Sequence, residues 1–335
     1  MLRTVLLEDY FDYARELPCV AELGEKTTLT IVTTKAKSES ETVERLADAD
    51  IVVTIRDRVV YTESLLAQLA HVKLLAACGS RITHIDVNAA TRYRIPITAP
   101  PVENHQNAAT KFTTVEQTWN LILGLNKQTL TNHATVQAGG WQTHPAGSLM
   151  GRTLGLIGMG TIGRMVAEVG VAMHMKVIAW SPHLTQERAQ AAGAESVSFE
   201  KIFEESDIVS LHAPLVPGNT GMVGQKELDS MKPHAILINT ARGDLVNERA
   251  IQDALATGKI AGAGFDVYWE EPLPSNHWLR RQDRALLQPH LGGMTDQGYE
   301  SLIAPAVDNV MAYLGGHPKN VINPEVLTVR PVGAR

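Results

Sequence analysis

Three glycines near the middle of the chain have the spacing of a phosphate-binding turn. Gly158, Gly160 and Gly163 follow an apolar run, Thr153–Ile157, and precede a segment with helical periodicity, Thr161–His174. The first glycine can make a tight turn, the second lets a pyrophosphate approach the backbone, and the third lets the helix pack closely on the strand. Because N–H groups at the start of a helix attract anions, the pattern predicts a dinucleotide-binding site rather than an ordinary turn.

Three charged residues later in the chain have the side chains needed for proton transfer and carboxylate binding. Arg242, Glu271 and His290 each come after a stretch that predicts a strand. The carboxyl ends of parallel strands meet at one edge of a sheet, so we expect these side chains to face the same ligand. Each residue alone could be a surface charge or a loop residue, whereas the three together form a chemically coherent set.

Two series of apolar strands and amphipathic helices must position these residues. The first series has predicted strands at Val5–Leu7, Leu29–Thr33, Ile51–Ile55 and Val72–Ala77, and predicted helices at Ser40–Ala47 and Thr62–Leu69. The second series has predicted strands at Thr153–Ile157, Lys176–Trp180, Asp207–Leu211, Ala235–Asn239 and Gly262–Val267. Such alternation is typical of parallel sheets in α/β domains.

Segments outside the two series indicate how the domains are connected. The polar, proline-containing stretch 99–107 is typical of a domain boundary or hinge. The helical pattern at Thr114–Leu125 is expected to cross to the second domain. The apolar face of Gln297–Leu314 is expected to pack back on the first domain.

Composition narrows the class of protein. The 335 residues are enough for two domains, and 44% hydrophobic and 20% charged residues are ordinary for a globular protein. A formal net charge of −6 argues against a nucleic-acid binder. Two distant cysteines give no disulfide framework, and the 12 histidines show no metal-ligand spacing. Early acidic residues and the lack of a long apolar run argue against a signal peptide or membrane helix, so we expect a cytoplasmic protein.

The order and spacing of five motifs resemble the D-isomer-specific 2-hydroxyacid dehydrogenase family. The motifs are Leu154–Gly163, Asp207–His212, Asn239–Val246, Asp266–Pro272 and Pro289–Gly293, together with Thr114–Trp119. The chain is similar to glyoxylate and hydroxypyruvate reductases, and to 3-phosphoglycerate dehydrogenases without their regulatory domain. The resemblance implies a Rossmann cofactor domain, 108–294, inserted in a flavodoxin-like substrate domain formed by 1–107 and 295–335. It also implies a homodimer, because the family commonly pairs through cofactor domains.

The resemblance gives the charged residues roles in reducing a 2-oxo acid to a D-2-hydroxy acid. His290 looks like the proton donor, because imidazole exchanges protons near neutral pH. Glu271 looks like its orienting partner, since a paired carboxylate fixes the tautomer and favours imidazolium. The planar guanidinium of Arg242 suits the substrate carboxylate. Asp266 is similar to the family residue that holds the nicotinamide carboxamide, although it could also be a turn residue.

The cofactor is expected to be NADP or NAD, with NADP favoured. Ser181 stands where NAD-binding domains usually carry an acid that holds the ribose 2′-OH. No arginine stands there either, and Arg188 lies farther along on a predicted helix. His183 is a candidate phosphate partner or a solvated loop residue. The expected cofactor-binding positions are Gly158, Gly160, Thr161, Ile162, Gly163, Ser181, Pro182, His183, Ala213, Pro214, Thr220, Thr240, Ala241, Asp266, Gly292 and Gly293.

The loop Cys78–Thr83 is expected to meet the substrate carboxylate with backbone N–H groups. The expected substrate-binding residues are Gly79, Ser80, Arg81 and Arg56. Arg81 replaces a glycine of the common family pattern, and could add charge, narrow the pocket or contact a second anionic group. Arg56 and Arg58 could line the same opening, or all three arginines could be solvated or paired with acids. The segment 103–111 looks longer than usual and could cover the cleft.

Two classes of function fit these observations. One is a reductase acting on glyoxylate, hydroxypyruvate or a larger 2-oxo acid, and the other is a nucleotide-sensing, corepressor-like protein with little catalysis. Arg242, Glu271 and His290 do not decide between them, because such corepressors can keep all three. The lack of an appended peptide-binding tail favours the enzyme. Formate dehydrogenases carry a glutamine where Glu271 stands, which makes formate oxidation less expected. The identity of the 2-oxo acid does not follow from one sequence.

Overall fold

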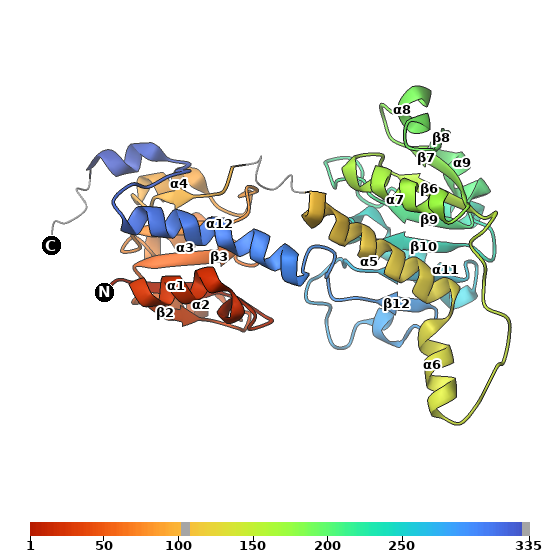
Figure 1. Cartoon of the computed structure of the whole chain (residues 1–335), viewed down its shortest axis with the longest axis horizontal. Coiled ribbons are helices and arrows are strands. Elements are labelled where there is room, and N and C mark those ends of the chain that lie inside the picture. The colour runs from red at the N-terminus through yellow and green to blue at the C-terminus, as the bar shows by residue number, and fades with distance from the viewer. Residues whose placement is uncertain (102–107, 330–335) are drawn as a thin grey trace. The chain divides into compact units, whose positions relative to one another are not determined.

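The computed structural model describes residues 1–101 and 108–329 and divides the chain into two compact units (Figure 1). Both ends of the chain form one unit, Met1–Thr110 with Asp296–Arg335, which we call the terminal unit. Lys111–Thr295 forms the other, which we call the central unit. Most of the segment 103–111, which was expected to cover the cleft, lies outside the described residues.

The terminal unit contains a parallel sheet of five strands with the order β2-β1-β3-β4-β5. Its strands are β1 (Arg3–Leu7), β2 (Thr28–Ile31), β3 (Ile51–Ile55), β4 (Leu74–Cys78) and β5 (Ile97–Thr98). Its helices are η1 (Ala14–Glu16), α1 (Pro18–Lys26), α2 (Glu39–Leu46), α3 (Glu63–Gln68), α4 (Val87–Arg92), α12 (Asp296–Leu314) and η5 (Pro324–Val329). This strand order is that of flavodoxin-like sheets, so the expected fold class of the unit is confirmed.

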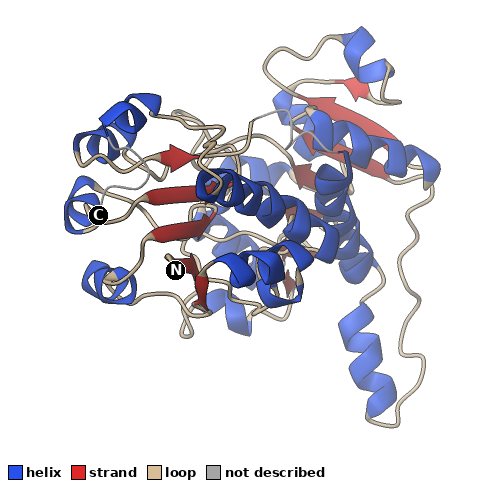
Figure 2. Cartoon of the chain, turned by 60° about the vertical axis from the view of Figure 1, so that its left-hand side comes forward, coloured by secondary structure: helices blue, strands red, loops and turns tan. Residues whose placement is uncertain are grey.

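Helices cover both faces of this sheet, which explains the apolar character of its strands (Figure 2). The strands β3 and β4 are buried along their whole length, as in parallel sheets that are covered on both sides. Apolar residues of α2, α3 and α4 pack on one face. The helix α12 contacts β3, β4 and α1, so the apolar face predicted at 297–314 packs as expected.

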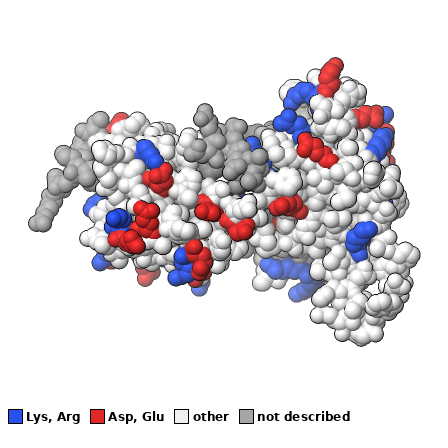
Figure 3. Space-filling view, in the orientation of Figure 1, with Lys and Arg blue, Asp and Glu red and all other residues white. Residues whose placement is uncertain are grey.

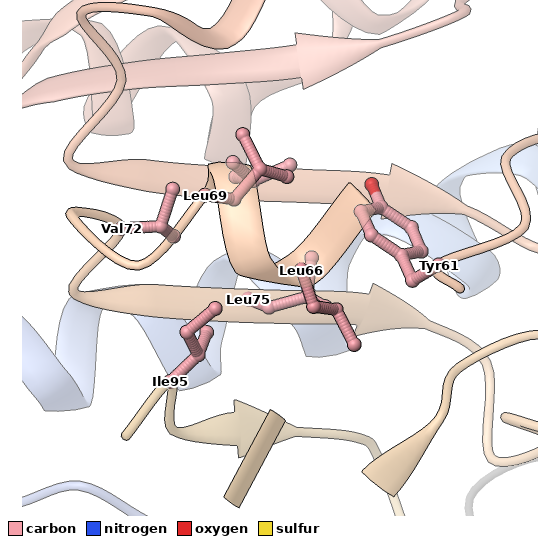
Figure 4. Close-up of a pocket in the computed structure, with 7 residues that line it drawn as sticks. Tyr61, Leu66, Leu69, Val72, Leu75 and Ile95 are labelled. Atoms are coloured by element: carbon pink, nitrogen blue, oxygen red, sulfur yellow. The ribbon is translucent and has the colours of Figure 1, made fainter. Parts of the chain in front are cut away.

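A small cavity lies in the apolar core of the terminal unit (Figure 4). Its volume is about 10 Å³, which is at most the space of one water molecule. It is lined by Val52, Tyr61, Leu66, Leu69, Val72, Leu75 and Ile95. We therefore interpret it as a packing defect and not as a binding site for an organic ligand.

The central unit contains a parallel sheet of seven strands with the order β12-β11-β10-β9-β6-β7-β8. The strands are β6 (Thr153–Ile157), β7 (Lys176–Trp180), β8 (Glu195–Ser196), β9 (Ile208–Leu211), β10 (Ile236–Asn239), β11 (Gly262–Phe265) and β12 (Ala285–Leu287). The helices are α5 (Ala108–Asn126), α6 (Thr129–Gln137), α7 (Thr161–Ala172), α8 (Gln186–Gln190), α9 (Phe199–Glu205), α10 (Gln225–Ser230), η3 (Gly243–Leu245), α11 (Glu248–Thr257) and η4 (Trp278–Arg281). The strand order reverses between β6 and β9, as in the Rossmann fold.

Two apolar layers hold the helices of the central unit against its sheet. Residues of α5 and α7 pack on one face, and residues of α9, α10 and α11 pack on the other. The doubly wound, parallel-sheet architecture expected for both units is therefore present. The carboxyl ends of all strands in each sheet lie at one edge, where ligands of open α/β sheets bind.

The helix α6 differs from the other helices of the central unit. None of its residues is buried, and Figures 1 and 2 both show it standing away from the sheet of its own unit. Residues 128–151 contain no Asp, Glu, Lys or Arg. Its exposed apolar side chains, with those of the loop that follows, are Leu130, Val136, Trp141 and Met150. We call residues 128–151 the uncharged arm.

The rest of the visible surface carries charges of both signs. On the face shown in Figure 3, Lys and Arg are interspersed with Asp and Glu, whereas the surface over α6 is nearly free of them. No helix within the described residues is long and apolar enough to cross a lipid bilayer. Among the same residues, no cluster of His, Cys, Asp and Glu has the arrangement of a metal site.

A buried aspartate joins the starts of three central strands. Asp207, just before β9, accepts hydrogen bonds from the N–H of Thr153 at 2.7 Å and from His234 Nε2 at 2.7 Å. Lys232 also donates to it, at 3.2 Å. Burial raises the pKa of the Asp207 carboxyl, but these donated bonds and the Lys232 charge outweigh it and lower the pKa below its ordinary value of 3.8.

We predict that Asp207→Asn lowers the free energy of unfolding by about 1–3 kcal/mol at pH 7, because a charged acceptor is lost. A group with a lowered folded-state pKa stabilises the protein above its unfolded-state pKa, and this contribution disappears as the pH falls. The difference between variant and wild type should therefore shrink below pH 3.8 in urea unfolding experiments. Asp253→Asn is the control, because its pair with Arg249 is exposed and should contribute little. Equal losses in both variants would contradict this assignment.

Candidate functional site

The glycine turn after β6 has the geometry that a dinucleotide requires. Gly158 has a φ of +100°, and a Cβ there would lie 2.6 Å from the backbone nitrogen of Ala213. A Cβ on Gly163 would lie 2.1 Å from the carbonyl oxygen of Gly158. By contrast, nothing lies within 4 Å of a Cβ built on Gly160. The turn is thus closed towards the protein and open at Gly160, at the start of α7, and this shape fits a pyrophosphate.

The loop after β7 contacts this turn. The Ser181 hydroxyl accepts a hydrogen bond from the N–H of Met159 at 2.7 Å. Pro182 and His183 are exposed. Arg188 lies on α8, as expected, but its guanidinium is turned back and donates to the carbonyl of His183 at 3.2 Å. Arg188 therefore lies next to the loop after β7, although it comes several residues later in the sequence.

His290 and Glu271 form a hydrogen-bonded pair. The ring Nδ1 of His290 lies 2.6 Å from Glu271 Oε2, and each side chain is 36% exposed. The other oxygen of Glu271 accepts from the N–H of Tyr268 at 2.9 Å. Burial raises the pKa of the Glu271 carboxyl, but the bond from His290, the N–H of Tyr268 and the charge of Arg242 lower it further than burial raises it. Glu271 is therefore an ionised hydrogen-bond acceptor near neutral pH.

Arg242 is held in a tight turn after β10. The buried side chain of Asn239 donates to the carbonyl of Arg242 at 2.8 Å and accepts from the N–H of Ala241 at 3.0 Å. A Cβ on Gly243 would lie 2.1 Å from the carbonyl carbon of Tyr268, so this turn packs directly against the loop that carries Glu271. The Arg242 side chain is exposed and donates a hydrogen bond to the carbonyl of Ala241 at 2.6 Å.

The carboxylate of Asp266 organises the loop that carries His290. Asp266 is 1% exposed and accepts from the N–H groups of Leu291 and Gly292, both at 2.8 Å. The side chain of Gln117 on α5 donates to it at 2.7 Å. Burial raises the pKa of the Asp266 carboxyl above its ordinary value, and the three donors offset this only in part. His290, next in the chain to Leu291, has a φ of +56°, a left-handed conformation that this loop imposes.

The helix α5 also positions the neighbouring loops. Thr114 donates to the carbonyl of Gly292 at 2.7 Å, and the hydroxyls of Thr118 and Thr240 are 3.0 Å apart. The remaining expected cofactor positions follow strand ends or begin α7. Thr161, Ile162, Ala213, Ala241 and Gly293 are partly buried, and Pro214 and Thr220 are exposed.

The expected substrate loop belongs to the terminal unit. Ile55 and Cys78 are paired in register, so Arg56 and Gly79 leave β3 and β4 side by side. Gly79 has a φ of +113° and Arg56 a φ of +53°. Ser80 is partly buried, and the side chains of Arg56 and Arg81 are exposed.

Arg58 has contacts of its own in the terminal unit. Its guanidinium donates to the carbonyl of Glu8 and lies 4.3 Å from the centre of the Tyr10 ring. The Tyr10 hydroxyl in turn donates to the carboxylate of Glu8. Arg58 is therefore engaged with the loop after β1, through a main-chain carbonyl and an aromatic ring.

Sequence reasoning missed the residues that hold these side chains in place. Tyr268 fixes the loop after β11, because its hydroxyl donates to the carbonyl of Gln288 at 2.8 Å and its N–H donates to Glu271. Asn239 and Gln117 act as described above. Two features of the sequence could have pointed to them. Asn239 is a polar residue at the end of an apolar strand, and Gln117 lies within the family motif 114–119.

Comparison with known proteins places this geometry in a family. Residues 119–292 match the model of the D-isomer specific 2-hydroxyacid dehydrogenase NAD binding domain, which is more than half of the chain. The glyoxylate reductase of Thermococcus litoralis is 34% identical over 89% of this chain and 90% of its own. The glycerate dehydrogenase of Methylorubrum extorquens is 34% identical over 84% of this chain and 88% of its own. A crystal structure of a putative D-3-phosphoglycerate dehydrogenase from Ralstonia solanacearum, 30% identical, superposes over 100% of both chains with a TM-score of 0.87.

The chain belongs to the D-isomer-specific 2-hydroxyacid dehydrogenase family. It is therefore by class an NAD-dependent dehydrogenase of D-2-hydroxy acids, and the resemblance deduced from the sequence motifs is confirmed. Its central unit contains the NAD-binding domain.

Two glycine variants should separate cofactor binding from folding. We predict that Gly160→Ala changes the free energy of unfolding by less than about 1 kcal/mol, because the space beside it is open, yet lowers dinucleotide affinity about tenfold or more. Gly163→Ala should lower both quantities, since its Cβ meets the Gly158 carbonyl. Fluorescence titration with NADPH and NADH, combined with urea unfolding, measures them. Unchanged affinity in Gly160→Ala would remove this turn from the cofactor site.

Proposed function

We propose that the protein reduces a small 2-oxo acid to the D-2-hydroxy acid, with His290, Glu271 and Arg242 as its catalytic residues. The observation that carries this proposal is the His290–Glu271 pair, which stands with Arg242 beyond the carboxyl ends of β10, β11 and β12. Two relatives, a glyoxylate reductase and a glycerate dehydrogenase, support a substrate with few carbon atoms.

His290 is proposed to donate the proton that the reaction requires. Its Nδ1 is occupied by Glu271, which leaves Nε2 as the ring nitrogen that gives a proton to the keto oxygen. Glu271 stays ionised because its pKa is lowered, and it therefore fixes the tautomer and stabilises the imidazolium. The nicotinamide cofactor, when bound, supplies the hydride that reaches the keto carbon. In the reverse direction His290 accepts the hydroxyl proton.

Arg242 and a loop of the terminal unit are the groups proposed to bind a substrate carboxylate. Arg242 is always charged and its planar fork matches a carboxylate. In the terminal unit, the loop that begins at the left-handed Gly79 is proposed to offer the N–H groups of Ser80 and Arg81 to a carboxylate. Arg56 leaves the adjacent strand beside this loop and is proposed as a further contact.

The cofactor is proposed to bind along the carboxyl edge of the central sheet. The turn 158–163 would hold the pyrophosphate, and Asp266 would hold the carboxamide with an oxygen lone pair left after its protein contacts. The remaining contacts are proposed at Ser181, Pro182, His183, Ala213, Pro214, Thr220, Thr240, Ala241, Gly292 and Gly293. The absence of an acid at Ser181 supports NADP over NAD, because no negative charge there repels a 2′-phosphate.

The test is cofactor oxidation by the purified protein with glyoxylate, hydroxypyruvate, pyruvate, phenylpyruvate and 2-oxoisocaproate. We predict that His290→Ala lowers kcat by about 10²–10⁴-fold while cofactor binding is kept, because general acid catalysis is lost. Glu271→Gln should lower kcat less, since it only orients the ring.

The matched control for this test is His317→Ala, an exposed histidine of the terminal unit, which should turn over like the wild type. Full activity of His290→Ala would refute the proton-transfer role. Cofactor binding with no turnover of any acid by the wild type would instead favour a nucleotide-sensing protein.

A homodimer is proposed because the uncharged arm exposes several large apolar side chains. Its Trp141 is 74% exposed and stands with Leu130, Val136 and Met150 in a segment without any charge. An exposed apolar surface of this kind marks a site of protein contact. A second copy of the chain is the partner that the family resemblance implies.

We predict that the wild-type protein sediments at twice the mass of one chain, and that Leu130→Glu with Trp141→Glu converts it to single chains. The reason is that two buried carboxylates would lack partners in the interface. Val60→Glu, at an exposed apolar residue of the terminal unit, is the control and should remain dimeric. A wild type that sediments as a single chain at micromolar concentration would overturn the dimer.

A further inference from the structure

The short helix α8 follows the loop after β7 and places Arg188 beside that loop. Thr185 caps this helix by accepting a hydrogen bond from the backbone N–H of Arg188, which fixes the backbone at that residue. The Arg188 guanidinium then donates to the carbonyl of His183 at 3.2 Å. Its Nη1 is thereby held beside the three residues that follow β7.

The charge of Arg188 has no acidic partner in the part of the chain that the structure describes. Three other helical arginines do have one: Arg45 pairs with Glu41, Arg92 with Glu63 and Arg249 with Asp253. The carbonyl of His183 is neutral, so it orients the guanidinium without cancelling its charge.

The nearest acid in sequence, Glu187, is engaged elsewhere. Its carboxylate accepts from its own backbone N–H and from the Thr185 hydroxyl, and these bonds lower its pKa. It therefore belongs to the first turn of α8, where a negative charge is favourable. The loop carries no other carboxylate between Trp180 and Arg188.

Ser181 completes the arrangement at the end of β7. Its hydroxyl oxygen accepts from the N–H of Met159, which ties the loop to the glycine turn. A Rossmann domain binds the adenosine ribose at the end of its second strand, which is β7 in this unit. An acid at that place holds a 2′-OH, whereas a nearby arginine accommodates a 2′-phosphate.

We propose that Arg188 and Ser181 bind the 2′-phosphate of NADPH, with Arg188 as the residue that makes the protein prefer NADPH to NADH. The proposal rests on the proposed function only in requiring that the central unit bind a dinucleotide in the Rossmann manner. The guanidinium would meet the phosphate as a charge-assisted and geometrically matched partner, already turned towards the loop by His183.

The experiment compares two nucleotides that differ only in this phosphate group. Calorimetry with adenosine 2′,5′-bisphosphate and with 5′-AMP measures binding of the full-length protein, and NADPH and NADH oxidation with the best 2-oxo acid measures kcat/KM. Arg188→Gln keeps a donor for the His183 carbonyl and removes the charge. We expect it to weaken bisphosphate binding by about tenfold or more and leave 5′-AMP binding unchanged. The kcat/KM for NADPH should fall by a similar factor, and that for NADH should stay within about twofold of the wild type.

The controls separate charge at this loop from charge elsewhere. Arg249→Gln removes an exposed arginine of the same unit that is already paired with Asp253. It should change the binding affinity of neither nucleotide. Arg188→Lys keeps the charge without the planar fork, and should bind the bisphosphate with an affinity between those of wild type and Arg188→Gln.

Two outcomes would overturn the proposal. One is a wild type that binds adenosine 2′,5′-bisphosphate no more tightly than 5′-AMP, and the other is an equal loss of both nucleotides in Arg188→Gln. If the proposed reductase activity is wrong but the phosphate site is right, no 2-oxo acid would be turned over, while binding of the bisphosphate would still depend on Arg188. That result would keep the phosphate site and discard the reaction.

Discussion

A buried carboxylate joins three separate stretches of the central unit, and the arrangement of the candidate site depends on it. A charge as buried as that of Asp266 is tolerated only when hydrogen-bond donors replace its lost water. Here the donors are the backbone of Leu291 and Gly292 and the side chain of Gln117. Because two of these donors are main-chain groups of the loop, the carboxylate fixes the path of the loop itself. His290 is held at the end of that loop, within reach of Glu271.

The second constraint is the close contact between two loop backbones. Gly243 leaves no space for a side chain against Tyr268, so the turn that carries Arg242 and the loop that carries Glu271 lie directly on each other. The Tyr268 hydroxyl then reaches the carbonyl of Gln288, just before the loop with His290. Three loops from different strand ends are in this way joined by short contacts that need no ligand.

Much of the fold could be predicted from the sequence because its strands are buried on both faces. The runs at Ile51–Ile55 and Ala235–Asn239 are mostly apolar, and the structure has buried strands there with nearly the same bounds. The strands β5 and β8 consist of two residues each, too few to show any periodicity. β12 is only partly buried along its length, so its residues gave no sharp apolar signal. Neighbouring strands in the sheet, and not the local sequence, define these three.

The candidate site was predictable in its residue types but not in its supports. Arg242, Glu271 and His290 could be found as polar residues after strands and then by the family motifs. Glu271 stands well beyond the end of β11, however, and what brings it to His290 is the bond from the Tyr268 N–H. Arg188 shows the same limit, because a helix cap and one turn of α8 reverse its direction. Such effects depend on the course of the backbone, which residue spacing does not reveal.

The packing of Gly243 under Tyr268 also bears on how such a protein can change its substrate. Any larger residue at Gly243 would push two loops apart at once, so the parts that hold Arg242, Glu271 and His290 can hardly vary one at a time. In the terminal unit, by contrast, the loops after β3 and β4 carry exposed side chains, those of Arg56 and Arg81. On the proposed function, new substrates would be acquired by exchanging side chains in the terminal unit while the central unit stays as it is. A library aimed at substrate range belongs in the loops after β3 and β4.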